Sequence, residues 1–170
     1  MTARTMSDIN ALATEAFVAA FGDVAEHSPW VAEAAAAARP FASREAMIAA
    51  FEAAILSADP DRQLALIRAH PDLAGRAAIA GEIAAESRRE QAGIGLDRLT
   101  PEEFARFTAL NDRYRETFGF PFILAVKNAT KNIILTSFEA RLGNNSKTER
   151  ETALAQIARI VRFRIEDRVA

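Results

Sequence analysis

The sequence predicts an all-α protein, folded as a single compact helical domain over residues 1–170. The chain is rich in Ala, has only 7 Gly and 6 Pro, and has short β-branched runs, so intrinsic propensities favour helix almost throughout. Helix-capping residues followed by apolar side chains at helical spacing recur along it. With 170 residues, 50% of them hydrophobic, the chain can bury one continuous core, and no linker or internal repeat divides it.

Two short helices are expected first. Ser7 is expected to cap a helix that ends at Gly22. Ser28, followed by a proline suited to the first helical position, is expected to cap a second helix over residues 30–38. That helix must stop before Pro40, because the residue preceding a proline is pushed out of the helical region.

Two further helices complete the first half. The third begins after Ser43, which caps it. Its apolar face comprises Met47, Ile48, Phe51 and Ile55. The fourth begins at Asp59 and carries Leu64 and Ile67 inward, with Leu66 as a further candidate, before it is halted at His70.

The middle of the chain is expected to continue as helices with short breaks. A turn or short helix over 72–79 and a longer helix over 81–91 come first, and two glycines then break the pattern. Thr100 and Glu103 form a capping box, with a proline in the first turn, and the helix that they start runs through Phe118.

The last third contains one ambiguous segment and two helices. Residues 119–121 interrupt the preceding helix, and the compact apolar run 122–126 can be a buried strand or a helical segment, which periodicity cannot decide. Thr130 leads into a further helix. Ser146 and Glu149 are expected to form a second capping box, which opens the terminal helix.

Composition excludes several classes of protein. The formal charge is −2 and the arginines are dispersed rather than gathered in a basic block, so we expect no nucleic-acid partner. With no Cys, disulfides and thiolate nucleophiles are excluded. No apolar run approaches the ~20 residues needed to span a bilayer, and the N-terminus lacks a signal-peptide pattern, so we expect no membrane partner and a cytoplasmic location.

His70 is the main candidate for a group that titrates near neutral pH, because His27 is the only other histidine. Pro71 restricts the backbone after His70, and rigid placement is what a general acid or base requires. The alternative is a helix-terminal histidine whose ring interacts with the last carbonyls of its helix.

A polar helix face follows His70 in the chain. Ser87, Glu90 and Gln91 have the spacing i, i+3 and i+4, which places them on one face, while Arg88 and Arg89 point elsewhere. A hydroxyl, a carboxylate and an amide together could bind a polar planar ligand. A solvated helix face is the other interpretation of such a run.

Other candidates are weaker. His27 beside Glu26 lacks a second His at ligand spacing, so no metal site is expected there. The Phe-rich segment 118–122 is typical of a core, although its irregular backbone needs hydrogen-bond partners that a ligand could supply. A helical interaction module and a metal-dependent hydrolase that uses His27, His70 and carboxylates remain open as alternatives.

Several blocks in combination resemble one known family. They include His-Pro-Asp-Leu-Ala-Gly at 70–75, Glu-Ser-Arg-Arg-Glu-Gln-Ala at 86–92 and Phe-Gly-Phe-Pro-Phe-Ile at 118–123. Further matching blocks lie at 26–31, 39–41, 95–97, 111–114 and 141–142. The chain resembles the 2-oxo-4-hydroxy-4-carboxy-5-ureidoimidazoline (OHCU) decarboxylases, which form (S)-allantoin in urate degradation, over nearly its whole length.

The resemblance implies an all-α homodimer that acts on a small-molecule substrate without a cofactor. It implies that His70 is the catalytic acid, and Glu90 is the second candidate catalytic residue. The substrate-binding residues that it implies are Pro71, Ser87, Arg88, Arg89, Glu90, Gln91, Phe122, Ile123, Leu124, Ala125, Val126 and one arginine of the last helix, for which Arg164 is preferred to Arg162. Ile94 departs from the small residue that the family would have in this turn.

Overall fold

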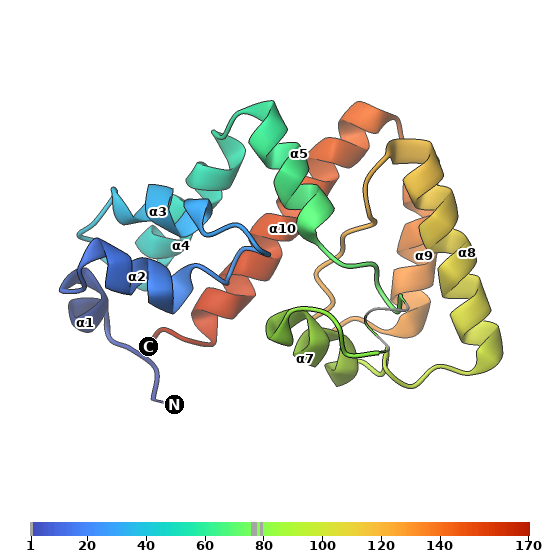
Figure 1. The fold of residues 1–170 in the computed structure, drawn as a ribbon, viewed down its shortest axis with the longest axis horizontal. Helices are drawn as coiled ribbons and strands as arrows, with labels where there is room; N and C mark the ends of the chain where they lie inside the picture. Colours follow the sequence, from blue (N-terminus) through green and yellow to red (C-terminus); the bar gives the residue numbers. More distant parts are fainter. Residues whose placement is uncertain (1, 76–77, 79) are drawn as a thin grey trace. The chain divides into compact units, whose positions relative to one another are not determined.

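The structure, a computed structural model, describes residues 2–75, 78 and 80–170, and confirms the all-α prediction (Figure 1). Within these ranges the regular structure is helical, apart from one isolated β-bridge between Arg4 and Val169. No helix in the described part is both long enough and apolar enough to cross a membrane. The chain divides into two compact units, one made of residues up to Ala69 with Ile157–Ala170 and the other of His70–Gln156. The single domain over 1–170 stays a prediction.

The first unit is a set of short helices around an aromatic core. It contains α1 (Met6–Asn10), α2 (Thr14–Phe21), α3 (Trp30–Ala36), α4 (Arg44–Leu56), α5 (Pro60–Ala69) and the end of α10 (Ser146–Glu166). Helix α3 packs against both α2 and α4. The Phe17 ring lies 5.2 Å from that of Phe21 and 6.1 Å from that of Phe51, centroid to centroid, and all three are buried.

The first predicted helix is in fact two helices. Thr5, not Ser7, caps α1, because the Thr5 hydroxyl accepts from the Asp8 N–H in a capping box. Helix α1 ends at Asn10, whose side-chain amide exchanges two hydrogen bonds with the backbone of Phe41, at 2.9 and 2.8 Å. The chain then leaves helical geometry before α2 begins at Thr14. Local propensity could not show the contacts of Asn10 with a distant segment.

Other boundaries in the first unit differ in smaller ways. The Ser28 hydroxyl donates to the carbonyl of Glu26 instead of capping α3, which ends at Ala36 rather than at residue 38. In α5, Leu66 is buried with Ile67, whereas Leu64 is only half-buried. The predicted helix starts after Ser43 and Asp59 are confirmed, since both side chains accept hydrogen bonds from the first turn of the helix that follows.

The second unit is built from α7 (Ala85–Gly93), α8 (Pro101–Phe118), α9 (Lys131–Leu142) and the start of α10. Helix α7 begins four residues later than the predicted 81, because Gly81 has a left-handed φ of 75°, which a helix excludes. The predicted turn or helix over 72–79 lies partly outside the described residues. The capping box of Thr100 and Glu103 is confirmed, and α8 ends at the left-handed Gly119.

Residues 122–126 form neither strand nor helix. The segment runs through a cluster of aromatic rings instead. The Phe122 ring stacks on that of Phe138 with centroids 3.7 Å apart, and the Tyr114 ring meets Phe122 edge-on at 5.3 Å. Ring packing and side-chain hydrogen bonds therefore replace the regular structure that the apolar run suggested.

The predicted capping box at the start of α10 is wrong. Asn145 makes the cap, since its side-chain oxygen accepts from the Thr148 N–H, and Ser146 is already helical. The Glu149 carboxylate is fully buried and accepts from Tyr114 and Arg141. Because the carboxylate binds the Arg141 guanidinium and the Tyr114 hydroxyl, it does not accept from the backbone N–H at the start of the helix.

Candidate active site

His70 opens the second unit on a loop with several anchors. It directly follows α5 and is 6% exposed. The Gln91 side chain on α7 accepts from the Ala74 N–H at 2.9 Å and donates to the Asp72 carbonyl at 3.3 Å. Asn111 on α8 donates to the Leu73 carbonyl at 2.8 Å. The three residues after Pro71 are thus bonded to two different helices.

A charged pair adds a further anchor. The Arg115 guanidinium donates from Nε to Oδ1 of Asp72 at 3.0 Å, and its Nη2 lies 2.9 Å from the same oxygen in an ion pair. Both side chains are partly exposed, so this pair contributes less than the buried amide contacts. Ala74 takes a left-handed φ of 54°, which is costly for a residue with a side chain and needs such support.

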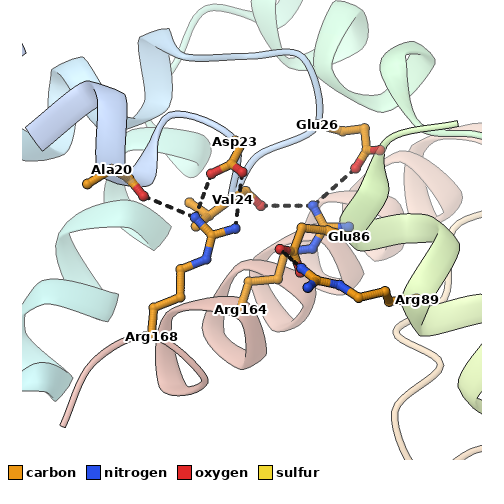
Figure 2. A network of polar contacts seen from close by, with 8 residues as sticks. All are labelled: Ala20, Asp23, Val24, Glu26, Glu86, Arg89, Arg164 and Arg168. Atoms are coloured by element: carbon orange, nitrogen blue, oxygen red, sulfur yellow. Dashed lines mark hydrogen bonds and ion pairs between the residues drawn. The ribbon is translucent and has the colours of Figure 1, made fainter. Parts of the chain in front are cut away.

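The predicted polar face of α7 exists. Ser87 and Gln91 are each 5% exposed, and Glu90 is half-buried. Arg88 and Arg89 are exposed on the other side, where Arg89 pairs with Glu86 (Figure 2). Gln91, on this face, directly bonds the His70 loop.

The segment 122–126 is held through its backbone. Arg141 on α9 donates from Nη1 to the Ile123 carbonyl at 2.6 Å, and Gln156 on α10 accepts from the Ala125 N–H at 3.0 Å. Most of the side chains of the segment are buried, whereas that of Leu124 is half-buried.

Helix α8 connects the His70 loop and the segment 122–126 within the second unit. Asn111 bonds the loop, and Tyr114, three residues later on the same face, packs against Phe122. The second unit therefore contains every predicted site residue except Arg164.

Arg164 belongs to the first unit, where it is 2% exposed. Its guanidinium donates to the Glu26 carboxylate at 3.0 Å and to the Val24 carbonyl at 3.2 Å (Figure 2). Arg162 is less buried and pairs with Glu45 at 3.0 Å, and the hydrogen bond to this glutamate raises the pKa of Arg162.

Sequence reasoning missed the supporting residues of this site. Asn111 and Arg141 lie in the blocks that resemble the family, but nothing in their local pattern indicates a contact with a loop or a backbone carbonyl. No pattern in the sequence indicates a role for Arg115 or Gln156. The spacing of Glu149 predicts a helix cap instead of a buried contact. His27 is exposed, and among the described residues no three His, Asp or Glu side chains form a metal-ligand group.

The fold and the site together define a class of small helical proteins. In this class, side chains of neighbouring helices make hydrogen bonds to a loop that contains a histidine followed by a proline. Comparison with known proteins makes this specific, because the profile of the OHCU decarboxylase family matches residues 10–166. The chain belongs to this family.

Individual relatives agree with the family assignment. The OHCU decarboxylase of Haloferax volcanii is 41% identical over 164 residues, which are 96% of this chain and 95% of the relative. A crystal structure of (S)-allantoin synthase has a TM-score of 0.77 at 30% identity; the match covers 98% of this chain and 54% of that protein. An OHCU decarboxylase structure determined with (S)-allantoin present has a TM-score of 0.65 at 19% identity over 92% of this chain and 97% of that one, which supports the fold alone.

Proposed function

We propose that this chain decarboxylates OHCU to (S)-allantoin as a carboxy-lyase of urate degradation. The observation that carries the proposal is the buried His70 on a loop fastened by Gln91 and Asn111, in a chain that belongs to the OHCU decarboxylase family. A single well-placed acid suits this reaction better than a set of strong nucleophiles or metal ligands.

The substrate supplies its own electron sink. Its carboxylate is β to a ring C=N nitrogen, so the electron pair of the breaking C–C bond moves into the ring as CO2 leaves. The neighbouring ring carbon, which carries the ureido group, then takes a proton while the hydroxyl of the decarboxylated carbon loses its own and becomes a carbonyl. The face that receives the proton determines the product enantiomer. No cofactor is needed for this sequence of steps, and we propose that the enzyme uses none.

The protein has to orient the carboxylate and deliver the proton to one face. We assign the proton and the steering of the carboxylate to His70. We assign to Glu90 the substrate hydroxyl or a ring N–H, and to Ser87 a ureido or ring amide. Gln91 already bonds two backbone groups of the loop, so its main role in this proposal is to hold the loop.

Further substrate contacts are proposed for residues that flank these groups. Pro71 lines the pocket beside His70, and the segment 122–126 closes over the ring. Exposed Arg88 and Arg89 provide positive charge near an anionic substrate, and Arg164 remains the proposed arginine ligand of the carboxylate.

The decisive experiment follows the chirality of the product. Freshly generated OHCU is mixed with the enzyme, and circular dichroism records whether (S)-allantoin forms faster than slow racemic decay. His70→Ala should lower the rate about 10²–10⁴-fold, the usual contribution of a positioned acid or base, with the fold retained. His27→Ala is the matched control, because His27 is exposed and lies in the first unit.

Two outcomes would contradict the proposal. A protein that leaves the decay slow and racemic would be a non-catalytic helical module. An activity lost on chelation would indicate the metal-dependent alternative. We further propose a homodimer in the cytoplasm, which sedimentation of the purified protein and fractionation of the source cells would test.

A further inference from the structure

Two long side chains make hydrogen bonds to the backbone of the segment 122–126, at Ile123 and Ala125. The Val126 carbonyl accepts from the Ala129 N–H. Since the segment is neither helix nor strand, no neighbouring backbone pairs with it regularly. The Ile123 carbonyl accepts from Arg141 Nη1 at 2.6 Å, and the Ala125 N–H donates to Gln156 Oε1 at 3.0 Å. The two anchors come from different helices and hold opposite types of backbone group.

Arg141 is itself held from three sides. It is 8% exposed, and its guanidinium lies 4.3 Å from the centroid of the Phe122 ring. Its Nε donates to Oε1 of Glu149 at 2.7 Å. Glu149 is 0% exposed and also accepts from the Tyr114 hydroxyl at 2.5 Å and from Asn144 Nδ2 at 2.9 Å.

Stability alone does not account for this arrangement. A buried ion pair is a weak source of stability, since desolvation offsets much of the attraction. Nη2 of Arg141 is also buried without a hydrogen-bond partner among the described residues. What the network does achieve is one fixed orientation of Nη1 toward the Ile123 carbonyl.

We propose that Arg141 and Gln156 are positioning residues that pre-form the segment 122–126 for the substrate. This inference rests on the proposed function, in which that segment closes over the substrate ring. Leu124 lies between the two anchors, and its backbone N–H and C=O make no hydrogen bond within the described part of the chain. Groups fixed before binding lose less entropy when a ligand arrives, so the anchors act on affinity.

The gentler test changes Gln156, which is only half-buried. Gln156→Leu removes the acceptor for the Ala125 N–H, and KM should rise about 2- to 10-fold, as expected for one hydrogen bond, with a smaller change in kcat. Gln156→Glu keeps an acceptor and should restore KM to near the parent value. Glu151→Leu is the control, since this exposed residue of the same helix pairs with Lys147, one turn earlier, and with no other cation among the described residues.

The second test changes Arg141 without removing its charge. Arg141→Lys leaves a cation for Glu149 but loses the planar fork and the stacking on Phe122, so KM should again rise. Amide hydrogen exchange across 122–126 gives a readout independent of turnover, and both Gln156→Leu and Arg141→Lys should make it faster. Far-ultraviolet circular dichroism checks that each variant is folded.

The outcomes separate this inference from the proposed function. A parent protein that forms no (S)-allantoin overturns the proposed function and this inference with it. An active parent whose folded variants keep the parent KM overturns the positioning role alone, even if their melting temperatures fall. Equal rises in KM for Gln156→Leu and Gln156→Glu would also overturn it, because the hydrogen bond would not be the cause.

Discussion

Removal of one hydroxyl from Tyr114 should measurably destabilise the protein. Tyr114 is fully buried, and its hydroxyl donates at 2.5 Å to Glu149, which is also fully buried. A hydrogen bond to a charged group contributes about 1.5–3 kcal/mol. Since Glu149 keeps Arg141 and Asn144 as donors, Tyr114→Phe should lower the free energy of unfolding by an amount in that range and no more.

The expected change is large enough for routine assays. In a domain of this size 1 kcal/mol shifts the melting temperature by roughly 2–4 °C, so Tyr114→Phe should melt about 3–12 °C below the parent. Urea unfolding followed by circular dichroism measures the free energy directly. Thr117→Val is the control, because the Thr117 hydroxyl is exposed and bonds only the Arg113 carbonyl of its own helix.

A double-mutant cycle makes the prediction specific to the Glu149 contact. Combining Tyr114→Phe with Glu149→Gln should give a coupling energy of about 0.5–3 kcal/mol. If Tyr114→Phe unfolds with the parent free energy, to within about 0.5 kcal/mol, the hydroxyl makes no significant bond to the buried carboxylate and the reasoning fails.

Three further predictions concern other contacts. Burial and the hydrogen bond to a carboxylate raise the pKa of Tyr114, the single tyrosine. An absorbance titration should therefore show Tyr114 un-ionised in the folded protein at about pH 10, and the contribution of Tyr114 to stability should be lost only above that pH. Partial burial raises the pKa of Asp23, but the hydrogen bond and charge of Arg168 outweigh it and the net pKa is lowered. Asp23→Asn should therefore cost under about 1 kcal/mol in urea unfolding at neutral pH. This cost should disappear as the pH falls below the ordinary carboxyl pKa and through the lowered pKa of the folded state, because the parent carboxylate then becomes neutral as well. Asn111→Leu removes the donor to the Leu73 carbonyl, so the turnover of OHCU should fall while circular dichroism shows the helices intact. Full activity would mean that the His70 loop does not need this hydrogen bond.

Local chemistry explains which helix starts were predictable. Ser43, Thr100 and Thr130 each accept from a backbone N–H three residues later, a contact that needs only the neighbouring residues. The polar face of α7 was likewise predictable, because the spacing of Ser87 and Gln91 determines which side of a helix they share. Almost any fold that contains these helices would keep their N-caps and their polar face.

Some of the predictions that failed involve partners far away in the chain. Glu149 fits a capping box by spacing, but Tyr114 and Arg141 bind its carboxylate. Ser7 fits a helix start, yet Thr5 caps the first helix, and that helix ends at Asn10, whose side chain bonds the backbone of Phe41. At Glu149 longer-range hydrogen bonds replaced the local one, whereas at the first helix the cap lies two residues earlier, at Thr5.

The sequence by itself determined the all-α class, most helix starts, the family and the loop that carries His70. These follow from propensity, capping and motif, which act over a few neighbouring residues. Only the tertiary structure decided how the functional segments are supported: Gln91 and Asn111 on the His70 loop, Arg141 and Gln156 on residues 122–126. Backbone groups in irregular segments must find partners wherever the packing of the helices brings them, and no local pattern encodes that choice.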